Sequence, residues 1–288
     1  MGNKRSKKDR KNKENIVKAR KDIAKKQKGQ IWIIIGAIVL IFIAFFVLFL
    51  FLAKDELPKK QEFSELKIGY SKYPYPPLHY FDSENELVGF DIDLAEAAAG
   101  LIGAKIEFVP IDWAERAELL ESKEVDLLWG GLERASLNEQ KIKFTKSYLR
   151  SDIVLLMNDD RDYAKLEELQ GLNVCTLNFT PAYYYLQVYS KDVIKSRRSF
   201  TPPNYMELMG ALDEGEFDCM ITDTSFASFY QRETKTNYKM SETVLGSNYA
   251  VAVRIEDTDL FDALQDALDQ LEADGTIASL REKWIANP

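Results

Sequence analysis

Along most of the chain, short apolar runs alternate with segments whose apolar residues recur at helical spacing. Apolar runs of four to eight residues predict strands, and apolar residues three and four positions apart predict amphipathic helices. Their alternation is typical of an α/β architecture built mainly on parallel sheets. The predicted strands are residues 66–70, 104–110, 125–130, 152–157, 173–177, 194–200, 217–223 and 248–255; the predicted helices are residues 91–102, 114–122, 181–190, 204–214, 225–231 and 259–273, with one more from Thr276.

The first 53 residues follow a different pattern. Residues 1–30 carry 13 lysines and arginines against 3 acidic residues, and residues 31–53 contain no charged or amide side chain. A helix that crosses a bilayer needs about 20 apolar residues, whereas a cleavable signal has a shorter apolar core. We therefore predict a basic cytoplasmic arm, residues 1–30, followed by one transmembrane helix, residues 31–53, that acts as a signal anchor.

The charges on the two sides of this apolar segment predict its orientation. The whole chain has a net charge of −8, but residues 54–288 carry 25 basic against 43 acidic residues. Because basic flanks stay in the cytoplasm, we expect a single-pass protein of the cell membrane with residues 54–288 outside the cell. An acidic domain is a poor partner for nucleic acid, so no nucleic-acid binding is expected.

The outer region is long enough for two lobes. A polar linker, residues 54–65, leads to roughly 220 residues, which is more than one small core usually holds. If the strand at 248–255 returns to the first half, two doubly wound lobes are joined by two crossings, with the ligand between them. Ligands of such sheets bind at the carboxyl ends of strands, where helix N-termini present free N–H groups.

Two loops fit that position. Gly130 and Gly131 follow the strand at 125–130, and glycine lets a ligand approach the backbone closely. Thr180 precedes Pro181 at the start of the helix at 181–190, where a threonine N-cap followed by proline is favoured.

Residues suited to catalysis or metal binding are few. His79 is the only histidine, and Cys175 and Cys219 have no metal-ligand spacing. We expect two buried free thiols, although a location outside the cell would allow a disulfide if the two strands are neighbours. We predict no catalytic residue, no metal and no cofactor.

Three segments of the outer region form a set in order and spacing. They are Tyr75-Pro76-Pro77-Leu78, the run LVGFDIDLA at 87–95, and the close of the chain, YAVAVRI at 249–255 with LDQLEADGTIASLREKW at 268–284. The set resembles the extracellular solute-binding proteins of polar amino-acid ABC importers, bacterial solute-binding protein family 3. The resemblance covers about residues 66–286. It implies the type II periplasmic binding protein fold, two lobes joined by a two-strand hinge, with lobe 1 formed by 66–152 plus 250–288 and lobe 2 by 153–249.

The resemblance also implies a ligand held between the lobes. Tyr75 and Trp113 would enclose the body of the ligand, and Asp223 would pair with its ammonium group, although that carboxylate could equally cap the helix at 225–231. The positions that would meet the rest of the ligand are Gly130, Gly131, Glu133, Arg134, Asn138 and Thr180.

Asn138 is the main departure from the family pattern. The family carries an arginine there that binds the ligand's α-carboxylate through two parallel hydrogen bonds, which a neutral amide cannot supply. Arg134 could replace it from one helical turn earlier, or could be a solvated surface residue. Glu133 replaces a small or hydroxyl residue, and Phe179 replaces a glycine beside Thr180. The remaining residues favour a ligand with a cationic amine and an apolar or aromatic body.

We therefore predict a membrane-anchored solute-binding protein, not an enzyme. It would capture an amino acid or related amine and deliver it to the permease and ATPase subunits of an ABC importer, with residues 31–53 in the membrane. Two alternatives remain open: a ligand-binding sensor that signals to a membrane partner, and a dehydratase-like enzyme on the same scaffold.

Overall fold

The computed structural model describes residues 36–49, 63, 65–134, 140–189, 196–200 and 205–285. The predicted arm, residues 1–30, most of the predicted linker and Asn138 lie outside the described residues. The chain divides into two compact units, residues 1–60 and residues 61–288.

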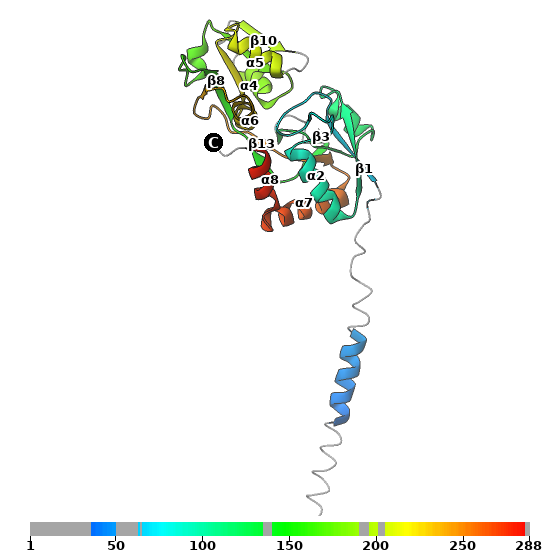
Figure 1. The fold of residues 1–288 in the computed structure, drawn as a ribbon. Helices are drawn as coiled ribbons and strands as arrows, with labels where there is room; N and C mark the ends of the chain where they lie inside the picture. The colour runs from blue at the N-terminus through cyan, green and yellow to red at the C-terminus, as the bar shows by residue number, and fades with distance from the viewer. Residues whose placement is uncertain are drawn as a thin grey trace, which may run out of the picture. The chain divides into compact units, whose positions relative to one another are not determined.

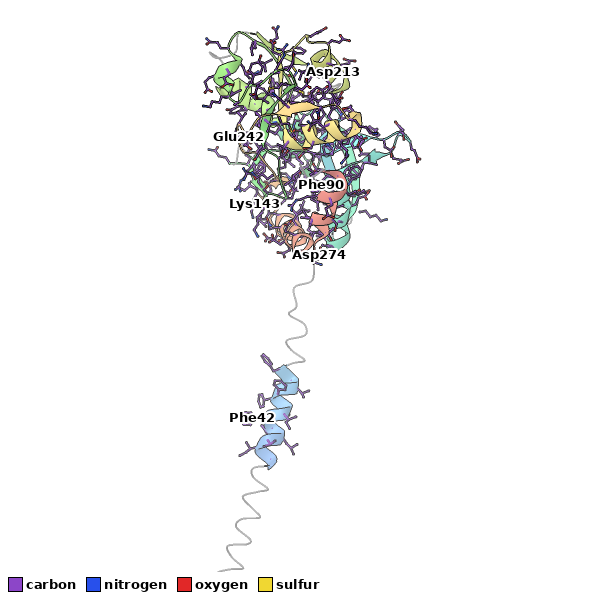
Figure 2. The ribbon with its side chains drawn as sticks, turned by 60° about the vertical axis from the view of Figure 1, so that its left-hand side comes forward. Phe42, Phe90, Lys143, Asp213, Glu242 and Asp274 are labelled. Carbon is purple, nitrogen blue, oxygen red and sulfur yellow. The ribbon has the colours of Figure 1, made fainter. Side chains whose placement is uncertain are left out.

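In the first unit, residues 36–49 form a helix with exposed apolar side chains. Phe42 and its neighbours stand outward from this helix (Figure 2). Across the described part of the chain, no helix combines the length and apolarity needed to cross a membrane. The transmembrane helix at 31–53 stays a prediction, because only its middle is described.

The second unit contains two five-stranded sheets (Figure 1). In the first, β1 pairs in parallel with β4 and β5, while β14 runs antiparallel to β5 and β6. Its order is β4 (Lys105–Ile111), β1 (Glu65–Ser71), β5 (Leu127–Leu128), β14 (Ala252–Arg254) and β6 (Ile142–Phe144).

In the second sheet, β9 pairs in parallel with β10 and β11, while β8 runs antiparallel to β11 and β12. Its order is β10 (Ser196–Phe200), β9 (Asn173–Leu177), β11 (Cys219–Asp223), β8 (Ile153–Asn158) and β12 (Tyr238–Met240). The expectation of mainly parallel sheets is thus wrong for β8 and β14. The chain enters both strands directly from the crossing segments, without the helical crossover that a parallel neighbour requires.

Helices cover both sheets. On the first sheet, α7 presents Leu260, Leu264, Leu268 and Leu271 on one buried stripe, and α7 and α8 pack beside α2 (Figure 1). In chain order, α2 (Phe90–Ile102) and α3 (Arg116–Glu121) lie between β3 and β5, and α7 (Thr258–Ala273) and α8 (Thr276–Trp284) follow β14. The helices α4 (Pro181–Tyr189), α5 (Tyr205–Asp213) and α6 (Thr224–Thr234) each follow a strand of the second sheet. Short elements among the described residues include the hairpin of β2 (Tyr80–Phe81) with β3 (Leu87–Val88), and the 3-10 helix η3 (Leu166–Leu169).

Two extended segments connect the sheets and pair with each other. β7 (Leu149–Arg150) runs antiparallel to β13 (Asn248–Tyr249), and the Ser151 N–H donates to the Ser247 carbonyl at 3.1 Å. The predicted continuous strand at 248–255 is therefore wrong in one respect. Its first residues pair with β7 and its last residues join the first sheet as β14, so it is two strands. The lobe boundaries at 152/153 and 249/250 stay predictions.

The largest buried cluster extends from one sheet to the other. It contains Leu127 of the first sheet and Met220 of the second, with Tyr75, Tyr249 and Phe226 in the same cluster. Smaller clusters cover the remaining faces, one around Trp113 and one around Ile221.

Candidate functional site

Asp223 lies at the end of β11 and forms the centre of a buried hydrogen-bond network. Its Oδ1 accepts the Ser151 hydroxyl at 2.7 Å and the Phe226 N–H at 3.2 Å, which makes it the N-cap of α6. Its Oδ2 accepts the Tyr75 hydroxyl at 2.6 Å. The side chain is 2% exposed, and burial raises the pKa of Asp223, although these donors favour the charged form.

Tyr75 brings the first half of the fold to this carboxylate. Tyr75 follows β1 in the chain, and its hydroxyl also lies 2.9 Å from the hydroxyl of Tyr249 on β13. Its backbone is fixed by the N–H of Tyr75, which donates to the His79 carbonyl at 2.7 Å, and its ring stands edge-on to the His79 ring. Tyr75 and Asp223, both predicted site residues, therefore meet directly.

In the glycine pair after β5, Gly131 packs against Tyr75 and Gly130 packs against His79. Gly131 has a φ of +64°, and a Cβ added there would lie 2.7 Å from Tyr75 Cε1, so only glycine fits. A Cβ on Gly130 would lie 3.4 Å from the His79 ring. The ring of Tyr75 thus lies against the Gly131 backbone, where the sequence predicts that a ligand approaches.

Asp91 holds this glycine loop through a hydrogen bond, and the sequence pattern does not single it out as a site residue. The Gly131 N–H donates to Asp91 Oδ2 at 2.8 Å, inside the protein. Burial raises the pKa of Asp91 to about 7, although the Gly131 N–H and the Tyr148 hydroxyl favour the charged form. The available signal was its place in the LVGFDIDLA run, which also predicts a helix start.

Trp113 is buried, and a second unpredicted residue, Arg116, covers it. The Arg116 guanidinium carbon lies 5.4 Å from the Trp113 ring centroid and 5.5 Å from that of Tyr184 on α4. Arg116 Nη1 also donates to the Trp113 carbonyl at 2.6 Å. The buried guanidinium of Arg116 thus contacts aromatic rings from both halves of the fold, and aromatic ring faces attract a positive charge.

Thr180 caps α4. Its Oγ1 accepts the Tyr183 N–H at 3.3 Å, and its hydroxyl donates to the Leu177 carbonyl at 2.7 Å. Phe179, with a φ of +63°, packs against the cluster that contains Trp113. The residue that replaces the family's glycine thus keeps the backbone conformation that glycine favours.

The other predicted site residues differ in their placement. Glu133 is half-buried, and its backbone pairs with that of Tyr249; burial raises the pKa of Glu133, while a hydrogen bond with Ser247 favours its charged form. The Arg134 side chain is exposed, and Asn138 lies outside the described residues. The structure therefore brings together Tyr75, Gly131 and Asp223, with Gly130 beside Gly131. Trp113 instead contacts Arg116, and Thr180 caps α4.

The groups suited to redox or metal chemistry are separate from this site. Cys175 and Cys219 are both free and buried, as expected, and they lie in clusters on opposite faces of the second sheet. No group of three or more His, Cys, Asp or Glu residues in the described ranges is arranged to hold a metal ion.

Comparisons with known proteins place most of the chain in one group. The sequence model described as bacterial extracellular solute-binding proteins, family 3, matches residues 66–287. The chain is 25% identical over 216 residues to the ABC transporter arginine-binding protein 1 of Escherichia coli, covering 73% of this chain and 87% of that protein. It is 26% identical over 238 residues to the glutamate-binding protein GluB of Corynebacterium efficiens, covering 77% and 79%. Its fold matches an ancestral arginine-binding protein bound to arginine with a TM-score of 0.69 and 28% identity, covering 78% of this chain and 99% of that one.

Proposed function

We propose, from the premise that this chain belongs to family 3 of the bacterial extracellular solute-binding proteins, that it captures an amino acid between its two lobes for an ABC importer. The observation that carries this proposal is the contact of Tyr75 with Asp223. Residues from both halves of the fold converge on one buried carboxylate at the end of a strand. A ligand there would contact both halves only when they are close together, so binding would favour closure.

The side chains would have the roles that the resemblance to the family implies, and the contact of Tyr75 with Asp223 supports them. Asp223 would pair with the ammonium group of the ligand, and Tyr75 and Trp113 would enclose its body. Gly131, Arg134 and Thr180 would meet its polar end. Two of the relatives are named as arginine-binding and glutamate-binding proteins, so ligands with cationic and with anionic side chains both occur among relatives.

The N-terminal segment would act as a membrane anchor. Its support is the uncharged run at 31–53, the basic arm before it and the exposed apolar side chains of residues 36–49. With the N-terminus in the cytoplasm, the solute-binding unit would stay tethered outside the cell beside its permease. Membrane fractions of cells that express the chain should retain it after alkaline extraction, and deletion of residues 31–53 should release it.

Thermal unfolding of the full chain in detergent tests the binding function. The panel contains amino acids and their decarboxylated amines, and a ligand at about 100 times its Kd should raise the free energy of unfolding by about 2.7 kcal/mol. If amino acids bind and the matching amines do not, the carboxylate is read despite Asn138. If amines bind as well or better, the site recognises a different class of ligand. Failure of the whole panel would contradict the proposal.

Substitution of Asp223 tests its assigned role. Asp223→Ala should abolish binding, and Asp223→Asn should do the same while keeping an acceptor for the Phe226 N–H that begins α6. Asp266→Ala, which removes an exposed acid from α7, is the control and should bind normally. An unchanged affinity in Asp223→Asn would remove Asp223 from the site.

A further inference from the structure

The acceptor positions of Asp223 are already largely filled by the protein itself. A carboxylate offers about two acceptor positions on each oxygen. The Ser151 hydroxyl and the Phe226 N–H use Oδ1, and the Tyr75 hydroxyl uses Oδ2. A ligand ammonium group therefore meets a carboxylate whose second oxygen already accepts a short hydrogen bond.

The bond from Tyr75 differs from the other two in what it connects. Ser151 and Phe226 belong to the crossing segment and to α6, next to Asp223 itself, whereas Tyr75 follows β1 of the first sheet, 148 residues away. Its O···O distance of 2.6 Å is typical of a charge-assisted bond to a carboxylate. This bond is thus a direct polar link between the two halves of the fold.

The hydroxyl is held in place from several sides. The Tyr75 ring fills the space beside Gly131 and stands edge-on to His79, with ring centroids 6.2 Å apart. Tyr249, from the paired crossing strand, places its hydroxyl 2.9 Å from that of Tyr75. These contacts fix the Tyr75 side chain in the orientation that points its hydroxyl at Asp223.

We propose that the Tyr75 hydroxyl competes with a ligand ammonium group for Oδ2 of Asp223, and that it thereby sets the specificity of the site and links the two halves of the fold. The proposal rests on the function proposed above. Of the positions counted above only one, on Oδ2 beside this hydroxyl, is left, so an amine competes with Tyr75 for Oδ2 and simple amines bind weakly. A ligand that also offers an acceptor near Tyr75 gives the hydroxyl a new partner in place of the bond to Asp223 that the ligand's ammonium group displaces.

The variant Tyr75→Phe tests this proposal, because it keeps the ring beside Gly131 and removes only the hydroxyl. Tyr70→Phe is the matched control: Tyr70 is a buried tyrosine on β1 that lies against the same His79. Spin labels are attached to Glu96→Cys on α2 and Glu167→Cys on η3, two exposed positions, in the full chain held in nanodiscs. Cys175 and Cys219 are buried, so the labels remain specific.

The first readout is the label-to-label distance without ligand, measured by double electron–electron resonance. Tyr75→Phe should shift the population from the short toward a longer distance by about tenfold, the change expected from one charge-assisted hydrogen bond. Wild type and Tyr70→Phe should keep the short distance. A short distance in Tyr75→Phe, or equal opening in Tyr70→Phe, would overturn the proposal.

The second readout is the thermal midpoint in methylammonium chloride against the same concentration of sodium chloride. Methylammonium should stabilise Tyr75→Phe at about a tenfold lower concentration than wild type, because Oδ2 is then open to it. Equal responses of the two proteins would overturn the proposal. Neither readout needs an amino-acid ligand, so failure of the ligand panel with wild type would contradict the proposed function separately.

Discussion

The two strand ends that meet at the candidate site are built on different chemistry. The end of β5 is a glycine pair that excludes side chains, since a Cβ at Gly131 would contact Tyr75 at 2.7 Å. The end of β11 is a buried carboxylate, Asp223, held by three hydrogen-bond donors. Steric fit therefore determines the first side of the site, and charge and hydrogen bonding determine the second.

The difference teaches where each side is sensitive to change. On the side formed by glycine backbone, any added side-chain atom should strongly lower stability. A side made of a carboxylate should respond to the loss of a donor while tolerating small changes in volume. Tyr75 belongs to both sides, because its ring packs on Gly131 and its hydroxyl binds Asp223.

The steric side should show the largest effect on stability. Gly131→Ala should lower the free energy of unfolding by roughly 2–4 kcal/mol, because the new Cβ meets Tyr75 and Leu78 and because a left-handed φ costs an alanine about 1–2 kcal/mol. Denaturant unfolding of the full chain measures this change. Gly100→Ala in α2 is the control: its Cβ meets open space, so it should be neutral or stabilising by up to about 1 kcal/mol. Equal midpoints for the two variants would contradict the steric account.

The stability of the glycine side should also depend on pH, through the ionisation of Asp91. Its folded pKa of about 7 exceeds the ordinary 3.8, so between these pH values the folded protein keeps a proton that the unfolded chain releases. The free energy of unfolding should therefore fall as pH rises through this window and level off above it, by at most about 4 kcal/mol from this group. Asp91→Asn should lack that contribution, and thermal midpoints from pH 4 to 8 measure it.

Subtraction isolates Asp91 from other titrating groups in that experiment. Burial lowers the pKa of His79 to about 4, which makes stability rise with pH up to the ordinary value of 6.5, but this term is common to both proteins. Asp266→Asn is the exposed control and should track wild type. A difference between wild type and Asp91→Asn that does not vary with pH would show that Asp91 is ionised throughout.

The smallest effect is expected from the cysteines of β9 and β11, the latter being the strand that ends at Asp223. Cys175 on β9 and Cys219 on β11 face opposite sides of the second sheet, so no covalent bond connects these strands. A reducing agent should leave the thermal midpoint unchanged. A thiol reagent should find two reactive thiols in denaturant and none in the folded protein. A midpoint that falls under reduction would show that more than hydrogen bonding holds this side.

Most helices and long strands could be predicted because their patterns span many residues. The apolar stripe of α7 and the runs that form β1, β4 and β8 carry their own periodicity. β6 and β12 have three residues each, too few for a period to show, and the break between β13 and β14 depends on which partner strand each half meets.

The site was predictable in its positions and less so in its contacts. Strand ends and the family pattern point to Tyr75, Gly131 and Asp223, but the bond between Tyr75 and Asp223 joins residues 148 positions apart. Arg116 reads as an ordinary charge at a helix start, and only the packing of α3 near α4 reveals that it is buried between two rings.

The position of β14 in the first sheet has a consequence for synthesis of the chain. Residues 252–254 lie between β5 and β6, so the first sheet lacks an inner strand until nearly the whole chain has left the ribosome. The strands of the second sheet all come from the uninterrupted stretch 153–240. Because domains fold as their residues emerge, the second sheet can assemble first, while the first sheet waits for the last part of translation.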